Sequence, residues 1–243
     1  MRDATFTDAA FTNAAVLAFV LLPLLLALAL AWGIFKAWRL SGAPAAGAAR
    51  AAGWSLAAAL LWMAVTSLVA ASGVLREWDR TPPPFALLVA AIFTLGVGLA
   101  FSGAGRRLAV LPLWALVAVQ GFRLPLELAM HAMAERGVMP ETMSYTGRNF
   151  DIVTGITAIV VAAAVAAGVA GRRTVLLWNW LGLALLGNII GVAILATPRF
   201  RYFGDDQLNI WVTYPPFVWL PAVMVLAALA GHLIVFRALR RQR

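Results

Sequence analysis

Four polar residues recur at intervals of four within a largely apolar stretch of the sequence. They are Arg123, Glu127, His131 and Glu135, and Gln120 lies one turn earlier. Because an α-helix repeats every 3.6 residues, this spacing predicts a polar stripe along one helix face. Such a stripe provides a cationic contact and groups that can exchange a proton, which suits a ligand or proton site. It suits a structural ion pair between Arg123 and Glu127 equally well.

A second polar group follows in the segment T-G-R-N-F-D at 146–151. Asn149 or Asp151 is placed to cap the helix that begins there. Capping does not explain Arg148, which we expect at the same membrane face as the stripe. Together with the stripe, these residues predict an anion or headgroup site. The complete predicted site consists of Arg123, Glu127, His131, Arg148, Asn149, Asp151 and Asn188.

Asn188 is included in the predicted site because of its expected depth in the bilayer. Counting 1.5 Å per residue places it near the level of Arg123, where it can join two helices or support the guanidinium. The same count places Asn179 and His232 near the opposite membrane boundary, roughly 25 to 30 Å from His131. With this separation and no cysteine in the chain, we expect neither a metal ion nor a cofactor.

The elements that must position these residues are membrane helices. Of the 243 residues, 63% are hydrophobic and 12% are charged, and the mean hydropathy is +0.89. This composition excludes a soluble protein. Charged residues divide the chain into stretches long enough to cross about 30 Å of hydrocarbon. A single domain, residues 1–243, is predicted with seven helices at 12–36, 53–75, 83–103, 108–134, 151–171, 174–196 and 215–238.

Individual residues predict further features of these helices and of the segment that joins the first two. Asp3 and Asp8 precede the first helix where a signal peptide carries positive charge, so we expect it to be permanent. Pro125 predicts a kink in the fourth helix. The Ala- and Gly-rich segment 36–53 predicts a flexible or surface-lying connector.

The basic residues predict the orientation of the chain. Positively charged loops remain cytoplasmic, so the N-terminus is expected outside and the C-terminus inside. Because the net charge of +9 arises from this bias, it gives no indication of nucleic-acid binding. The loops and the terminus expected on the inner side carry basic residues and no acidic residue. These basic residues are Lys36, Arg39, Arg50, Arg106, Arg107, Arg172, Arg173, Arg237, Arg240, Arg241 and Arg243.

Several segments of the second half resemble a family of small bacterial seven-helix integral membrane proteins. They are F-R-L-P-L-E-L at 122–128, G-R-N-F-D-I-V-T-G-I-T-A at 147–158, W-N at 178–179 and P-P-F-V-W-L-P at 215–221. The resemblance implies an all-α fold with seven spans. It implies no activity.

The sequence therefore favours a binding or transport protein of the bacterial inner membrane. Its polar site, open to the outside between the fourth, fifth and sixth helices, would take a small anionic or zwitterionic solute or a lipid headgroup. One alternative is an assembly or sensor subunit of a larger membrane complex, or a homo-oligomer, with a purely structural ion pair. The other is a lipid-modifying enzyme that uses Glu127 and His131 as acid and base.

Overall fold

The structure, a computed structural model, describes residues 14–241 and is helical without any strand in that range. The first residues of the predicted helix 12–36, together with Asp3, Asp8 and Arg243, lie outside the described residues. The main elements are α2 (Val16–Leu40), α3 (Ala45–Ala71), α4 (Pro84–Phe101), α5 (Gly103–Leu108), α6 (Leu113–Ala118), the 3-10 turn η2 (Val119–Phe122), α7 (Arg123–Ala134), α8 (Ile152–Ala166), α9 (Arg172–Leu195), the π-helical turn η6 (Leu220–Val225) and α10 (Leu226–Arg241).

Six helical segments have the length and apolar composition needed to cross a membrane. They are Val16–Leu40, Ala45–Ala71, Pro84–Phe101, Leu113–Ala134, Arg172–Leu195 and Leu220–Arg241. The predicted fifth span, 151–171, is an apolar helix of only 15 residues, α8. At 1.5 Å per residue, α8 is about 22 Å long, shorter than the hydrocarbon core.

The predicted connector at 36–53 is wrong. The helix α2 continues to Leu40 and α3 begins at Ala45, so four residues, 41–44, separate them. Gly42 makes the turn possible because its φ of +85° is costly for a residue with a side chain. Alanine is a strong helix former, and the Ala-rich start of α3 therefore folds as helix although it carries Arg50.

The predicted helix 108–134 is divided into shorter pieces. The short helix α5 ends at Leu108, and Pro112 then occupies the N-cap position of α6. The 3-10 turn η2 follows α6 and ends directly before Arg123, where α7 begins. This interruption lies one turn before Pro125, which cannot donate a backbone hydrogen bond to residue 121.

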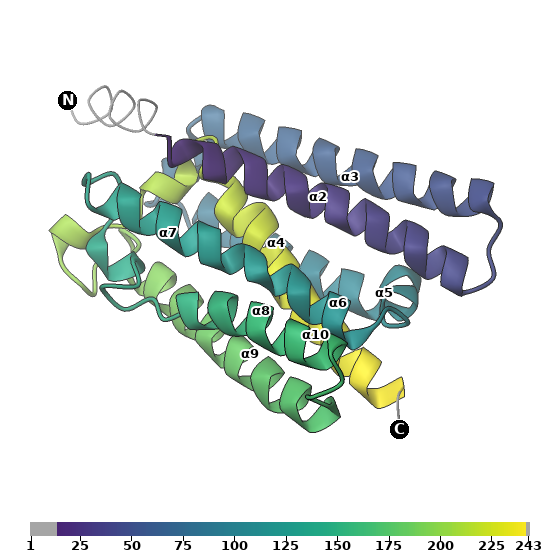
Figure 1. Cartoon of the computed structure of the whole chain (residues 1–243). Helices are drawn as coiled ribbons and strands as arrows, with labels where there is room; N and C mark the ends of the chain where they lie inside the picture. Colours follow the sequence, from purple (N-terminus) through teal and green to yellow (C-terminus); the bar gives the residue numbers. More distant parts are fainter. Residues whose placement is uncertain (1–13, 242–243) are drawn as a thin grey trace.

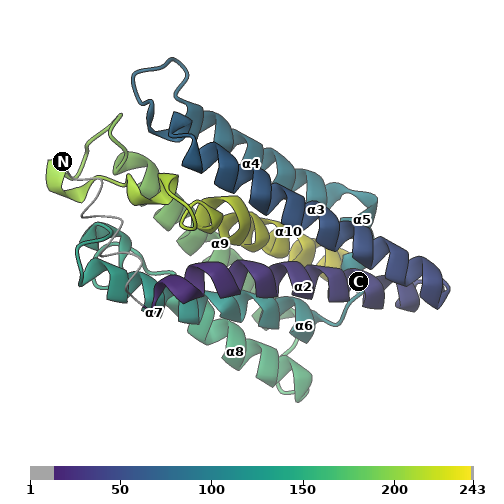
Figure 2. The same ribbon diagram turned by 90° about the horizontal axis from the view of Figure 1, so that it is seen from above.

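The helices form a bundle in which α2 and α3 pair as a hairpin at one edge (Figure 1). Figure 1 also shows α10 running obliquely behind α6 and α7, and α8 lying beside α9. A view turned by 90° places α8 and α4 at opposite sides (Figure 2). The oblique course of α10 brings it against α4, α6 and α9.

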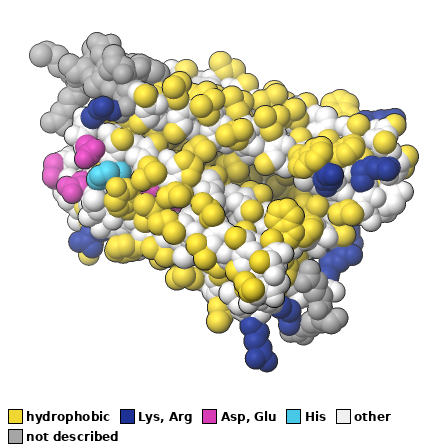
Figure 3. All heavy atoms as spheres, in the orientation of Figure 1, with side chains coloured by type: hydrophobic (Ala, Val, Ile, Leu, Met, Phe, Trp, Pro, Cys, Tyr) yellow, Lys and Arg dark blue, Asp and Glu magenta, His cyan; other side chains and the backbone are white. Residues whose placement is uncertain are grey.

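Charged side chains lie mainly at the two ends of the bundle, and apolar side chains cover the surface between them (Figure 3). Contacts between elements define the basic end: Arg172 Nε donates to Leu239 O at 3.0 Å, and Arg241 Nη1 donates to Arg106 O at 2.9 Å. The turn that joins α2 to α3 belongs to this end. Acidic side chains of the loops lie at the opposite end, near the start of α2.

Candidate functional site

Eight polar side chains are buried where α7, α8, α9 and α10 meet, and we call them the polar core. None is more than 4% exposed. Buried polar groups are costly in an apolar protein unless they are paired, so their partners determine what the core can do. The members are Gln120, Arg123, Glu127, Asn149, Asp151, Thr154, Asn179 and His232.

Arg123 forms its ion pair with Asp151 on the start of α8. The distance between Arg123 Nη1 and Asp151 Oδ1 is 2.8 Å, and Thr154 Oγ1 donates to the same carboxylate oxygen at 3.1 Å. The predicted pair of Arg123 with Glu127 is therefore wrong. Spacing along one helix identified a possible neighbour, but a carboxylate on a different helix lies within bonding distance of the guanidinium.

Asp151 stands at the N-cap position of α8 without capping it, because its carboxylate faces Arg123 and Thr154. Asn149 Oδ1 accepts a hydrogen bond from Asp151 N at 3.0 Å instead. The expected capping residue is thus the anionic partner of Arg123, and its neighbour satisfies the backbone.

Glu127 contacts a neutral amide. Asn149 Nδ2 donates to Glu127 Oε2 at 2.7 Å and to Met143 O at 3.0 Å. Among residues 14–241, no basic group lies within ion-pair distance of Glu127. The core therefore contains one guanidinium and two carboxylates, of which only one carboxylate is paired.

Glycine residues allow the helices to approach closely enough for these contacts. A Cβ atom at Gly155 would overlap Leu124 N and lie 2.9 Å from Arg123 C. The helix α8 thus rests directly on the backbone of α7, which positions Asp151, one turn earlier, opposite Arg123. Close helix contact through small residues is typical of membrane interfaces.

His232 and Asn179 belong to the polar core, although neither was included in the predicted site. His232 Nδ1 is 2.8 Å from Asn179 Oδ1, and Asn179 Nδ2 donates to His232 O at 3.1 Å. A Cβ atom at Gly182 would lie 2.5 Å from His232 Cε1. The carbonyl of Gly182 also accepts a 3.4 Å bond from Arg123 Nη1. Counting depth along single helices left both residues out of the site, because such a count does not include the contact between α9 and α10.

Gln120 completes the core from the side of α10. Its Nε2 donates to Ala228 O at 3.2 Å, and it also contacts Gly231, where a side chain would overlap it. Sequence spacing placed Gln120 on the stripe but did not include it in the site. Thr154 carried no sequence signal, because a threonine in an apolar helix is common.

Some atoms of the core have no hydrogen-bond partner among the described residues. They are Gln120 Oε1, Arg123 Nε, Arg123 Nη2 and His232 Nε2. Buried polar atoms are rarely left without a partner in proteins. The core thus retains two donor nitrogens on the guanidinium and one acceptor oxygen on the amide of Gln120, and His232 Nε2 can act as donor or acceptor.

Three predicted site residues lie outside the core. His131 contacts Ser144, with 3.0 Å between Nδ1 and Oγ, and its Nε2 is 3.6 Å from Glu135 Oε1. Arg148 is exposed and lies 5.3 Å from the ring centre of Phe203.

Asn188 donates to Arg148 O at 2.7 Å, which attaches the loop to α9. The role of Asn188 as a partner of Arg123 is therefore wrong.

Two cavities lie near the surface. One, of about 390 Å³, is lined by Glu141, Thr142, Gly147, Arg148, Phe150 and Gln207. The other, of about 530 Å³, lies at the basic end. Neither is lined by Arg123 or Glu127. Across residues 14–241, no three His, Asp or Glu side chains gather as a metal site requires.

The fold and the core define a class, that of multi-pass α-helical integral membrane proteins with a charged interior. Comparisons with protein-family models, curated proteins and solved structures yield no match. The function is therefore argued from the polar core itself.

Proposed function

We propose that the protein is a seven-span membrane binding or transport protein whose polar core takes a small zwitterionic solute. The observation that carries this proposal is the buried guanidinium of Arg123, which has one carboxylate partner and two N–H-bearing nitrogens without partners. Ionisable groups within membrane helices mark solute and proton pathways.

The charge of the core supports a solute that carries a positive group. One guanidinium faces two carboxylates, so with all three ionised the core has one excess negative charge. A proton on Glu127 or a cationic group beside it balances this charge. A purely anionic solute would increase the imbalance, and it would compete with Asp151 for Arg123.

A zwitterion also matches the unpartnered atoms. Its carboxylate can accept from Arg123 Nε and Nη2, and its ammonium group can face Glu127 or donate to Gln120 Oε1. Gln120, Arg123 and His232 come from η2, α7 and α10, so a solute held by them would join separate helices.

The orientation proposed with this function follows the charge at the ends of the bundle. The basic end, with the turn between α2 and α3 and the end of α10, is assigned to the cytoplasm. Seven crossings require α8 to cross as well, and its shortness is compatible with burial against α6 and α7. The expected location is the bacterial inner membrane.

The experiment is ligand-induced thermal stabilisation of the purified protein in detergent. Glycine betaine and glutamine are zwitterionic probes, and acetate and choline are the matched anion and cation. We expect stabilisation by a zwitterion, its loss in Glu127→Gln, and its retention in Glu135→Gln, an exposed acid of the same stripe. Equal stabilisation by acetate, or no difference between the variants, would contradict the proposal.

A second candidate, an assembly or sensor subunit with a structural core, is favoured by the partners within the core. Asp151 bonds to Thr154, and Asn149 bonds to Glu127, so much of the polarity is satisfied internally. This candidate predicts that no small solute shifts the melting temperature. The enzyme alternative has no such support, because Glu127 and His131 bond to separate partners.

A further inference from the structure

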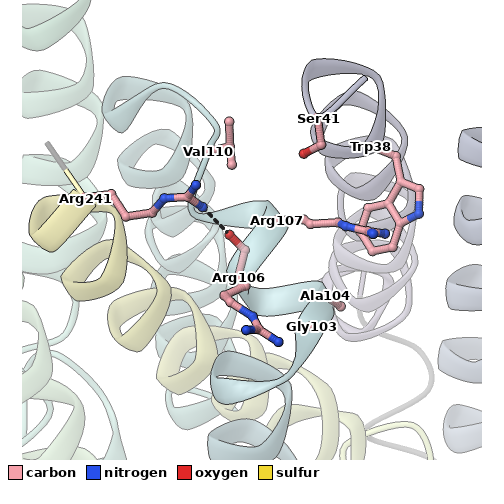
Figure 4. A pocket seen from close by; sticks show the side chains of 8 residues that line it. All are labelled: Trp38, Ser41, Gly103, Ala104, Arg106, Arg107, Val110 and Arg241. Carbon is pink, nitrogen blue, oxygen red and sulfur yellow. Dashed lines mark hydrogen bonds between the residues drawn. The ribbon is translucent and has the colours of Figure 1, made fainter. Parts of the chain in front are cut away.

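The larger of the two cavities near the surface, of about 530 Å³, lies at the basic end of the bundle. Figure 4 shows the residues that line it. The cavity is formed where the end of α2, the short helix α5 and the end of α10 meet. We call it the basic pocket. Its lining residues are Trp38, Ser41, Gly103, Ala104, Arg106, Arg107, Val110 and Arg241.

Three arginines line the basic pocket, and no carboxylate within the described residues pairs with them. Arg241 Nη1 donates to Arg106 O at 2.9 Å, which ties α10 to α5. Each guanidinium has five N–H donors, so most remain available. The pocket therefore combines positive charge with many donors that face no internal acceptor.

The side chains of the pocket are held in position. Figure 4 shows Arg107 extended along Trp38, and the guanidinium carbon lies 4.2 Å from the ring centre. Ser41 Oγ donates to Ala37 O at 2.7 Å, so its proton is engaged and the turn is fixed. Contacts thus hold the guanidinium groups of Arg107 and Arg241, and guanidinium groups match the oxygen atoms of a phosphate.

The pocket adjoins exposed apolar side chains. Leu40, beside Ser41, is 60% exposed, and Phe101, beside α5, is also 60% exposed. Tryptophan at the end of a span lies at the level of lipid headgroups. A molecule whose phosphate occupied the pocket could extend apolar chains along these side chains.

We propose that the basic pocket binds the phosphate of an anionic phospholipid headgroup at the basic membrane face. Charge, donors and an apolar border are all present, and the inner leaflet of a bacterial membrane supplies such lipids. This site is separate from the polar core and does not depend on its function.

The test is native mass spectrometry of the full chain with phosphatidylglycerol or phosphatidylcholine. Wild-type protein is expected to retain one phosphatidylglycerol in preference to phosphatidylcholine. The variant R106Q/R107Q/R241Q is expected to lose this binding at least about tenfold, because basic side chains at the membrane surface attract anionic lipids. The control R39Q/R50Q/R173Q removes the same charge from the same end outside the pocket and is expected to retain it.

Equal loss in both triple variants would show general surface attraction and overturn the proposal. Equal binding of the two lipids would do the same. Inorganic phosphate separates the sources: if it alone stabilises wild type as strongly as phosphatidylglycerol, the ligand is free phosphate and the lipid assignment is wrong. The single variant R107Q, whose guanidinium has no backbone bond to maintain, provides the test if the triple variant fails to fold.

Discussion

The guanidinium of Arg123 lies 2.8 Å from the carboxylate of Asp151, across the interface of α7 and α8. Both side chains are almost fully buried, so this bond joins two helices inside an apolar bundle. A buried pair contributes little net stability compared with apolar residues, but removing one partner leaves an uncompensated charge.

The pair predicts a specific pattern of stability. Arg123→Met or Asp151→Leu alone is expected to lower the free energy of unfolding by about 3 to 5 kcal/mol, because the remaining charge is buried without its partner. The double variant is expected to recover most of this loss. Thermal unfolding in detergent measures the effect. Additive losses in the double variant would show that the two side chains act independently.

Replacement of Glu127, unlike that of Arg123 or Asp151, is not expected to lower stability. Glu127→Gln removes the unpaired carboxylate and keeps an oxygen that can accept from Asn149. We expect a melting temperature equal to or higher than wild type, with solute stabilisation lost. Glu135→Gln, at an exposed position, is expected to change neither. A lower melting temperature in Glu127→Gln would assign the carboxylate a structural role.

Gly155 predicts a steric effect. Gly155→Ala introduces a Cβ that overlaps the backbone of α7, so we expect a loss of about 1 to 3 kcal/mol from overpacking. Gly187→Ala in α9 meets nothing within 4 Å and is the matched control. It is expected to be neutral or stabilising by about 1 kcal/mol, because alanine favours helix. Equal melting temperatures for the two variants would contradict the close contact.

The seven-span topology can be tested with introduced cysteines, since the chain contains none. Thr146→Cys precedes α8 and Val169→Cys follows it, and both positions are exposed. A maleimide that cannot cross membranes is expected to label Thr146→Cys in intact bacteria and Val169→Cys only after permeabilisation. Labelling of both in intact cells would show that α8 does not cross.

The sequence predicted the apolar helices and their approximate positions well, because composition alone determines which segments can enter a membrane. It also grouped Arg123, Glu127, Asn149 and Asp151, and in the structure hydrogen bonds link these four residues to one another. The ends of the helices were less accurate, since a helix such as α2 continues past the charge that was taken as its boundary.

The pairing within the site could not be predicted in the same way. Spacing along one helix suggested Glu127 for Arg123, whereas the partner is determined by how α8 rests on α7. His232 was left out of the site because its contact with Asn179 depends on how α10 packs against α9, which a single-helix count does not include.

The contact at Gly155 also fixes the register of α8 against α7. If α8 slid by one residue, Thr154 or Ile156 would replace the glycine, and both carry branched side chains at Cβ. The absence of a side chain at Gly155 therefore determines how α8 is aligned along α7. Motion between the two helices is restricted to directions that preserve this contact. We therefore expect α7 and α8 to behave as one rigid pair within the bundle.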